Sequence, residues 1–172
     1  LDENGVLVAT RIRFHVDNSV RMVSTVSAID AAAERLTVFG LQVATDRNTR
    51  FEDESAAAIE PFSLGDLHTD DWVDVRGYEY PADSGKVYAT RIERIDDLAA
   101  NGHRMRGPFR SPAQPDFDIL TVAVRTTDET LFRQETVPGE PAIRIDAATF
   151  FALDEETLVE ARGTWGGARL LA

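Results

Sequence analysis

The sequence predicts an all-β fold with two tandem small β-barrels, each carrying one short helix between its third and fourth strands. Three observations lead to this prediction. Short sequence matches recur in order along the chain, at offsets of 80 to 86 residues. Each copy contains short runs rich in Val, Thr and aromatic residues, separated by Gly, Pro and Asp. Hydrophobic residues make up 43% of the 172 residues, which is enough for a buried core.

Four matches define the repeat and its boundaries. They align 4–12 with 84–92, 36–38 with 120–122, 49–51 with 130–132, and 73–77 with 159–163. We therefore expect 1–20 to be the last strand of a preceding repeat, 21–98 to be the first complete barrel, and 103–172 to be the second. A strand at 1–16 without the rest of its barrel is expected to pair with a sheet edge, in its own chain or in a neighbour.

The first part of each repeat predicts three strands. Residues 22–29 are rich in Val, Ser and Thr and predict the first strand. The alternating apolar residues of 36–38 and 41–43 predict the second and third strands, with Gly40 at the break between them. In the second repeat, apolar residues alternate along 120–124 with the same period of two.

A short helix is predicted next. Asp146 would cap a helical stretch within 145–153, and Phe150 and Leu153 would face inward to close one end of the barrel. Residues 55–67 occupy the matching place in the first repeat, although Pro and Gly interrupt them. The side chains expected to face inward there are Ile59, Phe62 and Leu64.

Two strands complete each repeat. Residues 72–78 and 158–165 predict the fourth strands, and Gly-containing turns lead to the fifth. Three strands, a short helix and two strands is the element order of an oligonucleotide- or oligosaccharide-binding (OB) barrel. Closure is expected because five short strands would leave exposed edges in a flat sheet.

At this point the chain resembles a bacterial family of tandem domains of unknown function, often found in exported proteins. The residues that carry the resemblance are 26–30, 36–38, 73–77 and 85–92. The resemblance implies small OB-like barrel repeats and a periplasmic or extracellular location, and it implies no catalytic or ligand residues. The family commonly has Gly where this chain has Asp70, just before the fourth strand.

Composition narrows the function classes. The formal net charge is −12, which repels nucleic acid and anionic membranes at long range. There is no cysteine, so disulfides, thiolate catalysis and cysteine zinc sites are excluded. No segment is apolar for long enough to span a bilayer as a helix.

Candidate metal and catalytic groups are sparse. His15, His68 and His103 have no ligand spacing, so no metal site is predicted from them. The carboxylates of 52–54 and 66–71 lack a calcium-loop pattern and are interpreted as solvated loops. No serine lies in a nucleophile motif and no phosphate loop is present, so we predict no enzyme, no catalytic residue and no cofactor.

Aromatic residues of the fourth and fifth strands are the remaining candidates for a ligand surface: Trp72, Tyr78, Tyr80, Tyr88 and Trp165. Such rings stack on sugars or bases, or pack in a core or at a barrel edge. A nucleic-acid partner would need a basic groove, and the acidic surroundings of Arg104, Arg106 and Arg110 oppose one.

The sequence therefore predicts a protein of unknown function that acts as a non-enzymatic tandem β-barrel, an interaction or spacer module with a protein or glycan partner. Two alternatives stay open. One is a module that binds oligosaccharide or a divalent cation. The other is a hydrolase with an unrecognised pair of carboxylates, whose residues need not be close in sequence.

Overall fold

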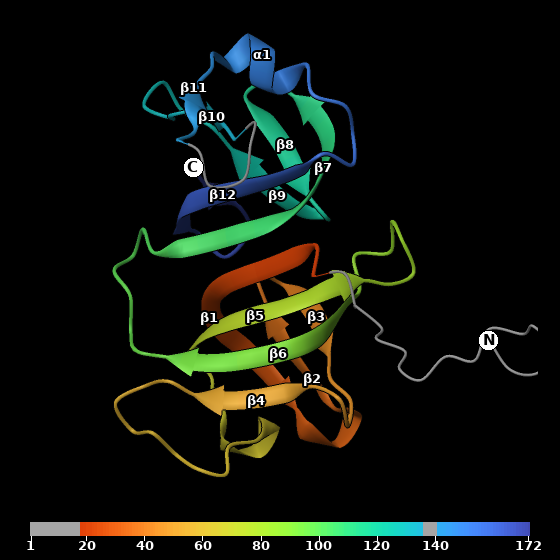
Figure 1. Ribbon diagram of the computed structural model, residues 1–172, viewed down its shortest axis with the longest axis vertical. Coiled ribbons are helices and arrows are strands. Elements are labelled where there is room, and N and C mark those ends of the chain that lie inside the picture. The colour runs from red at the N-terminus through yellow and green to blue at the C-terminus, as the bar shows by residue number, and fades with distance from the viewer. Residues whose placement is uncertain (1–17, 136–140) are drawn as a thin grey trace, which may run out of the picture.

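The computed structural model describes residues 18–135 and 141–172, and the predicted strand at 1–16 with its His15 lies outside them. Eleven strands form one connected sheet, and two more form a separate hairpin (Figure 1). The first half contains β1 (Val20–Asp30), β2 (Arg35–Val38), β3 (Leu41–Ala44), β4 (Arg50–Asp53), β5 (Trp72–Glu79) and β6 (Val87–Ile95), with 3-10 turns at Ala31–Ala33 and Leu64–Asp66. The second half contains β7 (His103–Ala113), β8 (Asp116–Ile119), β9 (Val122–Arg125), β10 (Arg133–Gln134), β11 (Ile143–Arg144), α1 (Ala147–Phe151), β12 (Leu158–Trp165) and β13 (Leu170–Leu171).

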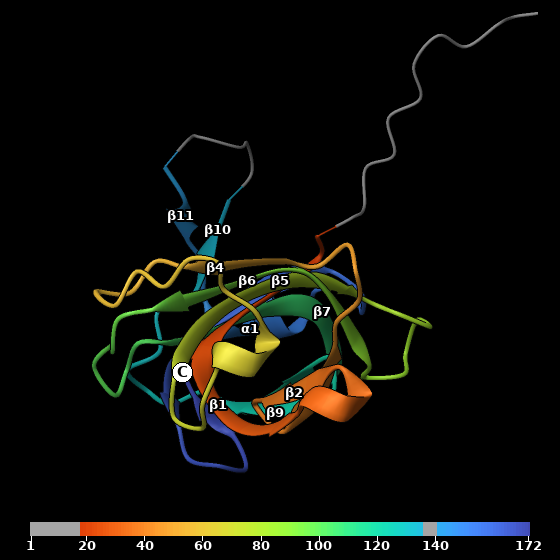
Figure 2. The same cartoon turned by 90° about the horizontal axis from the view of Figure 1, so that it is seen from below.

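The first half is a closed five-strand barrel. Its strands pair in the order β1-β2-β3-β6-β5 and back to β1, and only the β3–β6 pair is parallel. Seen end-on in Figure 2, these strands curve around a common interior. Alternating side chains fill that interior, among them Leu36, Val38, Val43 and Ile92, which are all almost completely buried. The predicted closure of this half is confirmed.

Strand β1 pairs with more than two strands because it is long and irregular. Its N-terminal part pairs with β5, its C-terminal part pairs with β2, and the register with β2 shifts between Val26 and Ala28. Such a bulge bends a strand and lets a short sheet curve into a barrel. Strand β4 lies outside the five-strand ring and pairs in parallel with β6.

In the second half the pairings run β7-β8-β9-β13-β12 and back to β7, again with one parallel pair, β9–β13. One side-chain hydrogen bond also occurs at equivalent positions in the two halves. The Thr49 hydroxyl donates to the carbonyl oxygen of Ala89 at 2.9 Å, and the Thr130 hydroxyl donates to that of Ala172 at 2.6 Å. Each threonine closes the turn that follows the third strand of its half.

The two halves are joined through their first strands. Strand β1 pairs antiparallel with β7, and Met22 lies opposite Met105 at the centre of the contact. Both methionines are fully buried. One face of the molecule is therefore a continuous sheet, the outer sheet, that runs β4-β6-β5-β1-β7-β12. In Figure 1, β7 lies directly above β1, where the upper half meets the lower.

One sequence match is wrong in its register. Residues 36–38 lie in β2, but Leu120 lies in the turn between β8 and β9 with φ 58°, and β9 starts at Val122. The residue at the same point of the first half is Phe39, with φ 54°. Both are buried apolar side chains, so the alternation continues across the turn and hides the end of the strand.

The two helix predictions have different outcomes. Asp146 caps α1 by accepting from the Thr149 N–H at 2.7 Å, and Phe150 and Leu153 pack against the core as predicted. In the first half the matching segment forms only one 3-10 turn, capped by Ser63. Ile59 was expected to face inward but is 41% exposed, because its N–H is held by Asp53 in a surface loop.

Asp70 has φ 73°, a left-handed conformation that glycine adopts at the lowest cost. Glycine would therefore fit this position, as the resemblance noted above implies. Asp70 donates its N–H to the Val26 carbonyl at 2.8 Å, which starts the β1–β5 pairing. Glu156 has φ 69° and makes the same bond to Phe109 in the second half.

Candidate functional site

The structure divides the five predicted aromatic residues into two groups. Trp72 and Trp165 lie where the two halves meet. The Trp72 ring stacks on His103 with centroids 4.6 Å apart, and Trp165 meets the Phe39 ring edge-on at 5.1 Å. Trp72 is only 7% exposed. Trp72 therefore packs between the halves and offers little surface to a ligand, and Trp165 is partly buried at the same place.

His103 lies in this joint, next to the β1–β7 pairs. Its Nδ1 lies 2.9 Å from the Ser24 hydroxyl across the β1–β7 contact, and its ring also meets Phe39. The imidazole is buried, and no charged side chain in the described ranges forms an ion pair with it. Burial lowers the pKa of His103 from its ordinary value, because it disfavours the charged imidazolium. The joint therefore favours the neutral form of this histidine.

Tyr78, Tyr80 and Tyr88 form the second group, on the outer surface of the first barrel. Tyr78 and Tyr88 are cross-strand neighbours whose rings stack with centroids 6.0 Å apart. Tyr80 meets Tyr88 nearly edge-on at 6.2 Å. Tyr80 is 62% exposed and Tyr88 is 37% exposed. We call these three residues the tyrosine cluster.

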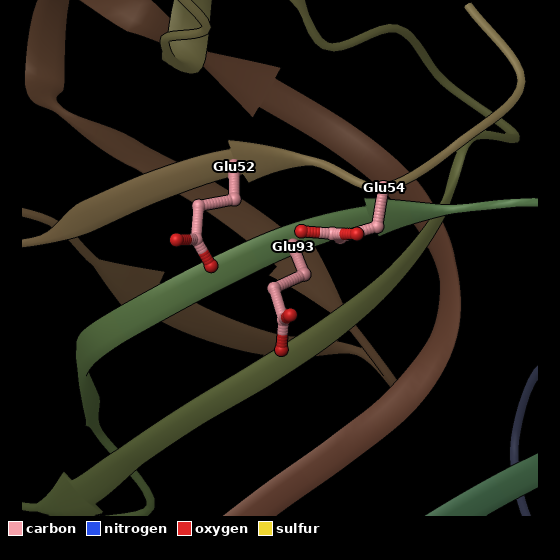
Figure 3. A group of neighbouring side chains, drawn as sticks. All are labelled: Glu52, Glu54 and Glu93. Carbon is pink, nitrogen blue, oxygen red and sulfur yellow. The ribbon is translucent and has the colours of Figure 1, made fainter. Parts of the chain in front are cut away.

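Three glutamates come together on the outer sheet and were considered for a metal ion. Figure 3 shows Glu52, Glu54 and Glu93, whose carboxylate oxygens lie within 4.8 Å of one another. Arg91 forms ion pairs with both Glu52 and Glu93. Burial raises the pKa of Glu93, which disfavours the ionised carboxylate that a metal ion would need as a ligand. The cluster is therefore part of an ion-pair network between strands.

The network continues across the outer sheet. Arg76 lies 3.7 Å from Glu93 and 3.9 Å from Asp74, and Arg21 bonds Asp74 at 2.6 Å. Next to these carboxylates, a row of arginines crosses the sheet at directly opposite positions on five successive strands. Its members are Arg50, Arg91, Arg76, Arg21 and Arg106. The acidic row beside them offsets the repulsion between these like charges.

Asp53, another predicted loop carboxylate, has a structural role. Its side chain is fully buried and forms an ion pair with Arg94. It also accepts from the Ser55 and Ile59 N–H groups. The Arg94 guanidinium and these donors hold the pKa of Asp53 far below its ordinary value. His68 is exposed near Asp71, and it does not approach His103 to form a histidine site.

A surface pocket of about 640 Å³ lies in the second half, among residues 114–115, the segment between β9 and β10, and the residues from β11 to the start of α1. Its lining includes three threonines, together with Asp128, Asp146, Arg144 and Phe132. Asp146 is the cap of α1, and its hydrogen bonds to Thr149 lower the pKa of the carboxyl. A carboxyl with a lowered pKa is a poor general acid.

Comparison with known proteins identifies one region of the chain. Residues 24–93 match the model of a domain of unknown function, DUF5666. The DUF5666 region begins within β1 and ends within β6, so it covers most of the closed first barrel. No curated protein and no solved structure matches the chain. The match agrees with the predicted resemblance to a domain of unknown function and assigns no activity.

The DUF5666 region contains the whole tyrosine cluster and Trp72, and Trp165 lies outside it. Sequence reasoning did not find the joint between the halves. Ser24 and His103 are 79 positions apart, and no local pattern links them. The only available signal was a histidine two residues before Met105 at the start of a strand, which also fits an ordinary core position.

Proposed function

We propose that the chain is a non-enzymatic interaction module made of two OB-like barrels that act as one rigid unit. The observation that carries this proposal is the β1–β7 pairing, which continues the sheet from one half to the other. An OB barrel pairs its five strands in the order 1-2-3-5-4, and both rings of strands have this order.

Side-chain contacts between the halves support rigidity. Arg110 of β7 bonds Glu79 of β5 at 2.8 Å, and both side chains are largely buried. Ser24 and His103 add a buried polar contact in the same joint. A buried ion pair that loses one partner costs several kcal/mol, so separating the halves is unfavourable.

The described carboxylates support the non-enzymatic part. Those with shifted pKa values hold neighbouring arginines or cap a helix: Asp53, Glu79, Glu93, Asp116 and Asp146. An enzyme of this kind would need ionisable groups converging on one cleft. We also propose an exported location, on the family resemblance alone. In the described residues, no helix is long and apolar enough to cross a membrane.

Backbone ¹⁵N relaxation tests the rigid unit. We expect amides of β5 and β12 to report one common rotational correlation time. Two separate correlation times would show that the halves tumble independently and would contradict the proposal. Turnover of any chromogenic glycoside or ester, abolished by replacing one carboxylate, would contradict its non-enzymatic part.

A further inference from the structure

The tyrosine cluster is the most exposed aromatic surface in the described residues. Cross-strand pairing places its members on one face. Tyr78 lies opposite Tyr88, and two residues further along β5 the Tyr80 N–H donates to the Lys86 carbonyl at 3.0 Å, beyond the Glu79–Val87 pair. On the other face of the same strands, Val87 is fully buried in the barrel. The three rings and Lys86 therefore share the outer face, at the end of β5 from which the β5–β6 loop projects in Figure 1.

The charges around this face restrict what it can bind. Glu79, next to Tyr78 and Tyr80, points away from the face and is held by Arg110 and by the Gly85 N–H at 2.6 Å. Arg76 and Arg91, which follow along the strands, are paired with carboxylates. Lys86 is the one cation on the face without an ion-pair partner among the described residues. The face thus offers aromatic surface, tyrosine hydroxyls and a single ammonium donor.

We propose that the tyrosine cluster, with Lys86, binds an uncharged glycan by stacking sugar rings on tyrosine. Aromatic rings supply apolar contact to the C–H face of a sugar, while hydroxyl and ammonium groups bond its oxygens. A polyanionic glycan or nucleic acid would meet one free cation and a chain of net charge −12. Among the residues that the structure describes, this face offers a cation no free carboxylate. An uncharged, hydroxyl-rich ligand fits these constraints.

This inference names the ligand class of the interaction module proposed above. It depends on the first barrel alone, because all four residues lie between 78 and 88. Independent tumbling of the two halves would therefore refute the rigid unit and leave glycan binding untouched. Failure to bind a glycan would leave the rigid unit untouched.

The test is a titration of the full chain with uncharged hexasaccharides of glucose, mannose and N-acetylglucosamine, followed by ¹H-¹⁵N NMR. We expect saturable shifts at 78–88 with at least one of them. The Tyr80→Ala/Tyr88→Ala variant should weaken binding by about tenfold or more, because stacking energy is lost. Tyr80→Phe, which keeps the ring, should bind within about threefold of the parent chain.

Leu131→Ala is the matched control, since Leu131 is 59% exposed in the second half. It should leave binding unchanged. The proposal is overturned if no uncharged hexasaccharide binds, or if the double variant binds like the parent chain with its spectrum still folded. Tighter binding of oligogalacturonate, lost in Lys86→Gln, would replace it with an acidic-glycan site. Shifts at 78–88 with a proline-rich peptide and none with glycans would replace it with a peptide site.

Discussion

At the scale of single residues, buried polar groups decide how the protein responds to pH and to substitution. Burial among aromatic rings and the Ser24 hydroxyl lowers the pKa of His103 and so favours its neutral form, and no carboxylate of the described residues pairs with it. Asp53 is ionised because Arg94 and three hydrogen-bond donors surround it. The two residues are expected to titrate in different ranges of pH.

The His103 prediction follows from the lowered pKa. The unfolded chain takes up the proton more readily than the folded chain, so this contribution to stability is complete above about pH 6.5 and is lost as the pH falls below it. Urea unfolding at about pH 7.5 and about pH 5.5 measures the loss. In His103→Gln the loss should be smaller. The exposed His68→Gln should behave like the parent chain, and an unchanged loss in His103→Gln would contradict the prediction.

Asp53→Asn is predicted to lower the free energy of unfolding by about 3–5 kcal/mol, because Arg94 is left buried without its partner. The pKa of Asp53 is lowered in the fold, so its stabilisation is present above about pH 4 and is lost as the pH falls further. Asp116→Asn removes an exposed pair with Arg125 and should have little effect. Equal destabilisation by the two variants, measured in urea, would refute this prediction.

At the scale of elements, the glycines of β5 and β12 are the clearest sequence signals of the fold. Gly77 and Gly163 end the matching runs 73–77 and 159–163, and both lie against a neighbouring backbone. A Cβ at Gly77 would overlap the Tyr88 carbonyl, and one at Gly163 would overlap that of Leu171. Each glycine therefore allows the fourth strand to approach the fifth closely.

Gly77→Ala and Gly163→Ala are each predicted to destabilise the fold by about 2–3 kcal/mol, since the backbone must shift to admit the methyl group. Gly65→Ala is the control. Its Cβ would meet only the Ser63 hydroxyl at 3.7 Å, so its midpoint should change little. Thermal unfolding followed by circular dichroism compares the three variants. A Gly77→Ala chain as stable as the Gly65→Ala chain would show that the strands have room to separate.

Sequence patterns predicted elements well where local chemistry specifies them. Residues 158–165 coincide with β12, Asp146 caps α1, and 22–29 lie within β1. The β8–β9 turn was missed because buried Leu120 continues the apolar alternation through it. For the candidate site, the sequence named all three residues of the tyrosine cluster. It could not separate them from Trp72 and Trp165, because burial at the joint depends on strands far apart in the chain.

At the scale of the whole molecule, charge is arranged as a paired network on the outside of a strongly acidic chain. The strongest pairs are partly buried, such as Arg21–Asp74 and Arg110–Glu79, and salt screens buried pairs weakly. The net charge of −12 acts over longer distances that salt does screen. Repulsion should therefore weaken more than attraction as salt is added.

We predict that the urea midpoint rises when NaCl increases from about 0.05 M to about 0.5 M at neutral pH, because screening relieves self-repulsion. The charge-neutral osmolyte sucrose at equal osmolality separates this effect from general exclusion. A midpoint that falls with added NaCl would show that the exposed pairs, such as Arg125–Asp116, contribute more than the net charge.

The β1–β7 contact also restricts how many such barrels can associate in this way. Met22 and Met105 face each other at its centre, with the strands antiparallel, so the contact is isologous: each half presents the same strand to the other. Both edges of each strand are occupied there, by β5 and β7 for β1 and by β12 and β1 for β7. A third barrel therefore cannot pair with β1 or β7 at this contact, because neither strand has a free edge there. A longer series of such barrels would therefore consist of pairs joined by this contact, and a different kind of junction would connect one pair to the next.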